Sequence, residues 1–90
     1  MPLKRCVLRD LRSLAQFYDE LARQLAFPPH FGRNLDALWD VLTVEVAGPF
    51  EIVWEESAKA QANLGLDYAK LIILLNDLAA ERDDFTFTLR

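Results

Sequence analysis

The spacing of apolar side chains changes several times along this chain, and each change marks a boundary between predicted elements. Short stretches rich in β-branched and aromatic residues at 4–8, 50–54 and 85–89 are predicted to be strands. The stretch 85–89 alternates cleanly between apolar and polar residues. The stretch 50–54 alternates only in part, which favours a strand that is largely covered on both faces.

Between the first two strands, apolar residues recur every three or four positions, which is typical of amphipathic helices. Ser13 can cap a first helix, which Pro28 and Pro29 bring to an end. Asn34 is a suitable cap for a second helix over residues 35–43. The expected apolar faces are Leu14, Phe17, Tyr18, Leu21 and Leu25 on the first helix and Leu35, Leu38, Trp39 and Leu42 on the second.

The second half of the chain is predicted to hold a short helical turn and one long helix before the last strand. The turn spans residues 57–61, and the long helix runs from residue 66 to about residue 81. The main apolar stripe of the long helix is expected to be Tyr68, Leu71, Ile72, Leu75, Leu78 and Ala79.

This order of strands and helices predicts the α/β class. Strands separated by helices pair in parallel through right-handed crossovers. We therefore expect a single small domain over residues 1–90, in which about four helices pack on a three-stranded parallel sheet. A length of 90 residues and a hydrophobic content of 52% allow one such core. The place of the last strand in the sheet stays open.

Composition argues against several functional classes. One histidine and one cysteine give no zinc-ligand spacing, the three glycines form no phosphate loop, and no cofactor or metal is expected. Cys6 is predicted to be a small buried hydrophobe rather than a reactive thiol. The longest apolar run, residues 71–75, is too short to span a membrane, although it could face a second protein. The N-terminal residues lack the apolar core of a signal peptide, so we expect a cytoplasmic protein without a membrane partner.

Charge is distributed unevenly along the chain, whose net charge is −4. Residues 1–33 carry six basic and three acidic side chains, whereas residues 34–90 carry four basic and eleven acidic ones. An acidic surface of this kind repels nucleic acid and favours encounter with a basic protein. The simpler alternative is that the acidic residues only keep the surface soluble.

Asp36 and Asp40 lie one turn apart beside the apolar face of the second predicted helix, and we call this pair the acidic ridge. Like charges at this spacing cost an isolated helix roughly 0.2–0.5 kcal/mol, so the pair suggests a cationic partner outside the chain. Two alternatives remain: Asp36 stabilises the first turn while Asp40 is merely solvated, or the two carboxylates are catalytic. The pair implies no cleft, so an enzyme is not expected.

The run from Ala26 to Thr43, AFPPHFGRNLDALWDVLT, resembles the signature of the barstar family, which are intracellular inhibitors of the secreted ribonuclease barnase. Its most specific part is NLDALWD at the start of a helix. The length, the order of elements, the strand that ends in Trp54 and the alternating last strand extend the resemblance over essentially the whole chain.

The resemblance implies that the second helix and the loop before it block the active site of a small basic ribonuclease. A carboxylate at the position of Asp40 enters the enzyme's phosphate pocket, and Asp36 adds a second charge beside it. The implied partner-binding residues are His30, Gly32, Asn34, Leu35, Asp36, Trp39, Asp40, Thr43 and, on the last long helix, Asp77.

Five positions depart from the family's pattern, among them Asp77, which stands where the family has a glutamate. His30 stands where the family has a tyrosine, Arg33 replaces an acidic residue, and Val44 and Glu45 replace a glycine and a tryptophan. Despite these differences, the resemblance implies a barstar-like ribonuclease inhibitor, and a monomer is the expected state. The alternative is a barstar-fold interaction or immunity module for a different toxin or a regulatory partner. Asp40→Ala is expected to weaken binding severely, Asp36→Ala and Trp39→Ala appreciably, and Asp19→Ala very little.

Overall fold

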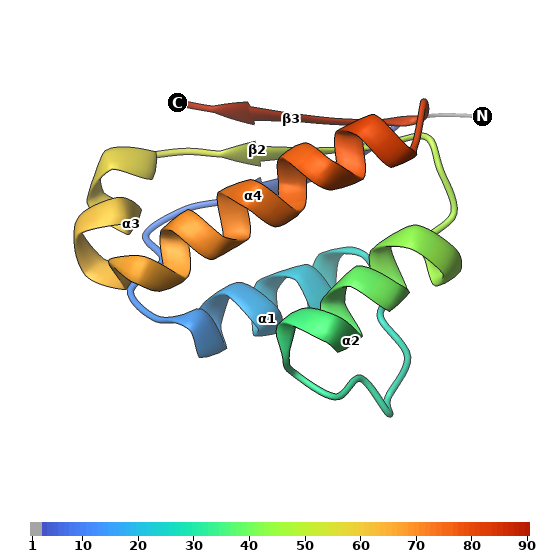
Figure 1. Ribbon diagram of the computed structural model, residues 1–90, viewed down its shortest axis with the longest axis horizontal. Helices are drawn as coiled ribbons and strands as arrows, with labels where there is room; N and C mark the ends of the chain where they lie inside the picture. Colours follow the sequence, from blue (N-terminus) through green and yellow to red (C-terminus); the bar gives the residue numbers. More distant parts are fainter. Residues whose placement is uncertain (1–2) are drawn as a thin grey trace.

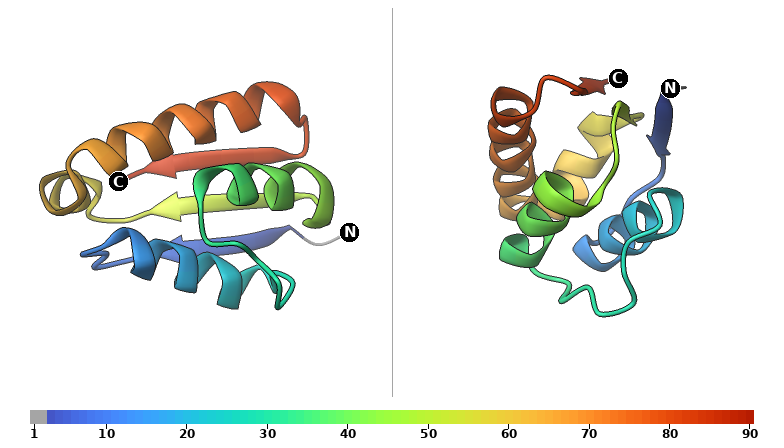
Figure 2. Two further views of the ribbon diagram at one scale, coloured as in Figure 1. Left: turned by 60° about the horizontal axis from the view of Figure 1, so that its bottom comes forward. Right: turned by 90° about the vertical axis from the view of Figure 1, so that its right-hand side faces the viewer.

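The sheet and the helices form two layers, and every helix of the described chain lies on the same face of the sheet (Figure 1, Figure 2). The computed structural model describes residues 3–90. In chain order the elements are β1 (Lys4–Leu8), α1 (Leu14–Gln24), α2 (Leu35–Asp40), the π-helical turn η1 (Val41–Glu45), β2 (Phe50–Trp54), α3 (Ser57–Leu64), α4 (Leu66–Glu81) and β3 (Phe85–Leu89). The predicted α/β fold, a three-stranded parallel sheet with four helices, is confirmed.

The strand order explains why the helices share one face. The order is β1-β2-β3, and both neighbouring pairs are parallel, with Cys6 aligned to Ile52 and Ile52 aligned to Phe87. Both connections are crossovers, and they step across the sheet in the same direction. Crossovers of the same hand then place their helices on the same side. The last strand, whose place the sequence left open, is an edge strand paired with β2.

The opposite face of the sheet is covered by side chains instead of helices. It carries the ion pairs Arg5–Glu51 and Arg9–Glu55, each with a nitrogen–oxygen distance of 2.5 Å. Val53 of β2 lies on this face and is only 5% exposed, because side chains of the flanking strands surround it. The expectation that β2 is covered on both faces is thus confirmed, although no helix contributes to the second face.

The core lies between the sheet and the helices. Trp54 is its largest fully buried side chain, and its ring packs against Phe17 and Tyr68 with centroid distances of 5.2 Å in both cases. Cys6 is also fully buried, and burial raises the pKa of its thiol to about 12. The thiolate is therefore absent at neutral pH, which confirms that Cys6 acts as a small hydrophobe.

Two predicted elements differ in extent from the observed ones. The turn expected over residues 57–61 is the eight-residue helix α3, which reaches Leu64. Ala60 and Leu64 are buried one turn apart, so packing extends a helix that its polar sequence hardly signals. The helix expected over residues 35–43 ends as an α-helix at Asp40 and continues as the π-turn η1.

The buried face of α4 is rotated from the predicted stripe. Ala79 is exposed, and Tyr68 and Ile72 are only partly buried. Within the run 71–75, Ile73 is 62% exposed. The rotation follows from the position of α4, which packs against α2 and η1 as well as the sheet. Its buried residues are Leu71, Leu74, Leu75 and Leu78.

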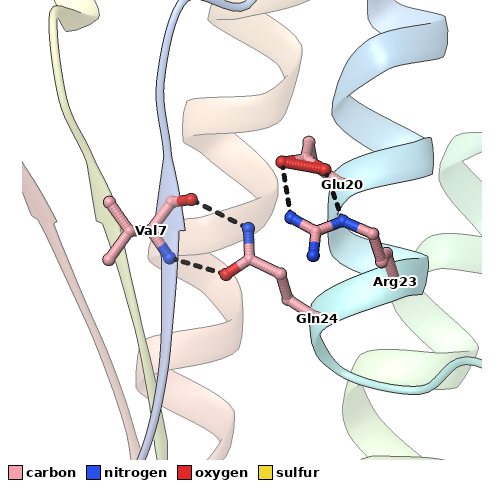
Figure 3. A network of polar contacts seen from close by, with 4 residues as sticks. All are labelled: Val7, Glu20, Arg23 and Gln24. Atoms are coloured by element: carbon pink, nitrogen blue, oxygen red, sulfur yellow. Dashed lines mark hydrogen bonds and ion pairs between the residues drawn. The ribbon is translucent and has the colours of Figure 1, made fainter.

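The open edge of β1 is closed by a side chain of α1 (Figure 3). Because the neighbours of Val7 along β1 pair with β2, the backbone groups of Val7 point away from the sheet. The amide of Gln24 satisfies both: its Oε1 accepts from the Val7 N–H at 3.0 Å, and its Nε2 donates to the Val7 carbonyl at 2.8 Å. Gln24 thus attaches α1 to the sheet edge.

Gln24→Ala should therefore lower the free energy of unfolding by about 1–2 kcal/mol, because two part-buried backbone groups lose their partner. Urea unfolding measures the loss, and amide exchange at Val7 locates it. Arg23→Ala is a matched control on the same turn, since among residues 3–90 Arg23 pairs only with Glu20, on the exposed side of α1 (Figure 3). Equal losses in the two variants would show that the contact at the edge contributes nothing.

Candidate protein-binding site

The segment that carries the acidic ridge, α2 with η1, lies between α1 and α4 in the helical layer (Figure 2). Its start is fixed by Asn34, whose Oδ1 accepts a hydrogen bond from the Ala37 amide at 2.7 Å, as its predicted role as N-cap requires. The Asn34 Nδ2 also donates to the carbonyl of Gly32 at 3.3 Å. A Cβ at Gly32 would lie 3.3 Å from the Cβ of Ala37, so the loop passes close to the first turn.

Asp36 and Asp40 are both exposed, one turn apart on α2. Neither carboxylate forms an ion pair or a hydrogen bond with a side chain or backbone group of residues 3–90. Asp36 lies in the first turn, where the helix dipole favours an anion. Asp40 is the last residue of α2 and lacks that support. At least this second charge has no structural reason within the described chain.

The ridge rests on a partly buried base. Leu38 and Leu42 are fully buried, and Leu35 and Trp39 are partly buried against the core. Val41, the first residue of η1, is only 5% exposed and belongs to the core cluster. The predicted contact residues Leu35 and Trp39 therefore stand at the border between core and surface.

Thr43 links the two parts of the segment. Its Oγ1 donates to the carbonyl of Trp39 at 2.7 Å and lies 3.2 Å from the carbonyl of Asp40. The hydroxyl thus fastens η1 to the last turn of α2. Val44 and Glu45 follow in the same turn and are exposed, and Val44, at 80%, is the most exposed large hydrophobic residue of the described chain.

The loop before α2 is anchored by one aromatic residue and presents another. Phe31 packs edge-on against Tyr18 and Phe27, with ring centroid distances of 5.6 and 5.0 Å. His30 and Gly32, on either side of it, are exposed. The predicted contact residues His30 and Gly32 are therefore accessible next to the start of α2.

Arg33, the departure that could repel a basic partner, is neutralised within the chain. Its φ of 54° places it in the left-handed region, and its guanidinium pairs with Asp19 on α1 and lies 5.8 Å from the centre of the Tyr18 ring. Arg33 therefore contacts α1 instead of the ridge. A change at Asp19 would release this cation three residues from Asp36, so the small effect expected for Asp19→Ala depends on where Arg33 then points.

The remaining negative charge gathers on two neighbouring helical segments. Seven ion pairs connect residues 3–90, and seven other carboxylates have no such partner in this part of the chain. Three lie on α2 and η1, three lie on α4, and one follows α4 directly. These two segments contact each other, and Asp77 is exposed on α4. The seven are Asp36, Asp40, Glu45, Asp67, Asp77, Glu81 and Asp83.

The ridge is a surface and not a pocket. Three depressions of the described surface are lined by residues of β1, α1 and α3 and the loops next to them, and neither Asp36 nor Asp40 lines any of them. Residues 3–90 contain no group of three or more His, Cys, Asp or Glu that could hold a metal ion. No helix in the described range is long and apolar enough to cross a bilayer.

One residue that supports this site escaped the sequence analysis. Arg82, just after α4, donates to the carbonyl of Leu42 within η1 at 2.8 Å and to that of Val46, which directly follows η1, at 2.7 Å. These contacts join residues about forty positions apart, so no local pattern signals them.

Comparison with known proteins finds a matching family and a similar protein. The family model described as "Barstar (barnase inhibitor)" matches residues 1–90. A protein of Bacillus subtilis (strain 168), named "Putative ribonuclease inhibitor YrdF", is 37% identical over 79 residues, which cover 86% of this chain and 86% of that protein.

Proposed function

The chain belongs to the barstar family, and we propose that it is a cytoplasmic protein that inhibits a small basic ribonuclease by covering the active site of that enzyme. The observation that carries the proposal is the acidic ridge, whose two exposed carboxylates have no counter-ion among residues 3–90. The name of the family and that of the relative both refer to an inhibitor, and the relative's name refers to a ribonuclease. The chain acts by binding alone and carries out no catalysis.

The chemistry of the ridge suits a ribonuclease active site. Such a site holds the phosphate of RNA with cationic side chains, and these remain without a partner when no substrate is bound. A carboxylate presented among them accepts charge-assisted hydrogen bonds and imitates the phosphate. Asp40 takes this role, and Asp36 adds a second negative charge one turn away.

The surroundings of the ridge supply the remaining contacts. His30, Gly32 and Asn34 bring the loop against the rim of the enzyme, and Leu35, Trp39 and Thr43 form the contact surface of the segment. Asp77 extends the acidic surface onto α4. Because the cap at Asn34 and the hydroxyl of Thr43 fix both ends of α2, binding orders few side chains and loses little conformational entropy.

Titration of barnase with the purified chain, followed by cleavage of a fluorogenic RNA substrate, tests the proposal directly. We expect inhibition that is complete at an equimolar ratio. The association rate should fall by about tenfold as ionic strength rises from tens of millimolar to half molar, because opposite charges steer the encounter. Undiminished cleavage at excess chain, with barnase and with a ribonuclease encoded beside this gene, contradicts the proposal.

A second candidate function is binding to a different toxin or to a regulatory protein. Val44 and Glu45 favour it, because they place an exposed apolar residue and a charge where the family's pattern has a glycine and a tryptophan. Pull-down from the source organism with mass spectrometry distinguishes the candidates. A captured protein without ribonuclease activity supports the second.

A further inference from the structure

Arg82 lies at the junction of α4, η1 and β2, and all three of its guanidinium nitrogens have hydrogen-bond partners. Its side chain is only 14% exposed. Nε and Nη2 pair with the two carboxylate oxygens of Asp84, each at 2.8 Å, and the guanidinium lies 4.9 Å from the centre of the Phe50 ring. Nη1 is left to donate to the carbonyls of Leu42 and Val46.

The Leu42 carbonyl lies within the π-turn η1, and the Val46 carbonyl belongs to the residue that directly follows it. In an α-helix the amide of Val46 would donate to the carbonyl of Leu42. Here it donates one residue further back, to Val41 at 3.1 Å, and Arg82 occupies the Leu42 carbonyl in its place. The guanidinium therefore replaces a backbone donor and supports the wide turn of η1.

The space around the guanidinium is kept free by a glycine. A Cβ built on Gly48 would lie 1.8 Å from Oδ2 of Asp84 and 2.9 Å from Nη2 of Arg82. Any larger residue at position 48 would displace the pair. The chain between η1 and β2 thus closes around the Arg82–Asp84 pair, which fixes the guanidinium relative to the sheet.

On the basis of the function proposed above, we propose that Arg82 is a positioning residue for the segment formed by α2 and η1. It links the sheet to η1, and Thr43 links η1 to the carbonyls of Trp39 and Asp40. Arg82 touches no partner. Its role is to hold the end of the segment so that the carboxylate of Asp40 meets the enzyme in one orientation.

Arg82→Met keeps an unbranched apolar stem over Phe50 and removes all the donors. Without a partner, hydrogen exchange at residues 43–46 should become at least about tenfold faster, while exchange in α1 stays unchanged. With the ribonuclease, affinity should fall about tenfold, and Arg82→Lys should recover part of it by returning one donor to the carbonyls. Arg23→Met is the control with the same change of charge, because within the described part of the chain Arg23 pairs only with Glu20 of α1.

A double-mutant cycle separates positioning from a general loss of stability. If Arg82 acts through Asp40, Arg82→Met should weaken binding far less in an Asp40→Ala background than in the wild type. Equal losses in both backgrounds, or unchanged exchange at residues 43–46, overturn the proposal. If the wild type inhibits no ribonuclease, the proposed function fails, and the exchange experiment alone then decides whether Arg82 holds η1. If Arg82→Met does not fold, Arg82→Lys provides both measurements.

Discussion

Asp40→Ala should remove most of the affinity of the chain for its ribonuclease, by roughly 2–5 kcal/mol, while the fold stays intact. The carboxylate has no partner among residues 3–90, so its loss should change the free energy of unfolding by less than about 0.5 kcal/mol. In the proposed complex the same change would leave the cations of the enzyme desolvated without a counter-charge. Calorimetric titration against the ribonuclease and urea unfolding of the free chain give the two numbers.

Two further variants separate charge from shape at this position. Asp40→Asn keeps the size and some hydrogen bonding but not the charge, and it should lose nearly as much affinity as the alanine variant. Asp83→Ala makes the same change in net charge outside the ridge, in the turn between α4 and β3, and should mainly slow association. Wild-type affinity for Asp40→Ala would exclude phosphate mimicry by this residue.

The acidic ridge could be predicted from the sequence because all of its determinants are local. Asn34 caps the helix, the apolar face is set by the 3.6-residue period, and Asp36 and Asp40 lie beside that face. Exposure of the two carboxylates follows from the same pattern. The three strands and the helix α1 could be placed for the same reason, since each has a marked residue pattern or a clear terminating residue. The long apolar-rich run of α4 marked its extent but not its buried face.

The parts that could not be predicted depend on contacts between distant residues. At the π-turn, the Leu42 carbonyl accepts a hydrogen bond from Arg82, a residue forty positions away that no local pattern connects to it. The sequence places the positive charge of Arg33 close to the acidic ridge. Its pairing with Asp19, on another helix, could not be predicted from a local pattern. The rotation of the buried face of α4 also depends on a neighbour, because Leu71–Leu75 is apolar nearly all round and its sequence favours no single side.

Trp54→Ala should have the largest effect on stability, lowering the free energy of unfolding by about 3–5 kcal/mol. The indole is fully buried and packs between Phe17 of α1 and Tyr68 of α4. Its removal therefore leaves a cavity between β2 and these two helices. A domain of this size has a total stability of about 5–15 kcal/mol. Thermal and urea unfolding should therefore show a transition at much milder conditions, or a chain already partly unfolded at 37 °C.

Trp54→Phe is the informative comparison, because the indole Nε1 of Trp54 is buried without a hydrogen-bond partner in the range 3–90. An unsatisfied buried N–H costs about 1–3 kcal/mol. Phenylalanine removes that cost while it keeps most of the aromatic contact with Phe17 and Tyr68, so the net loss should not exceed about 1 kcal/mol. A net loss clearly above about 1 kcal/mol would contradict the assignment of the indole Nε1 as an unsatisfied donor. The phenylalanine variant keeps the core that supports α2, so it should inhibit the ribonuclease like the wild type, which separates the support of the core from the chemistry of the ridge.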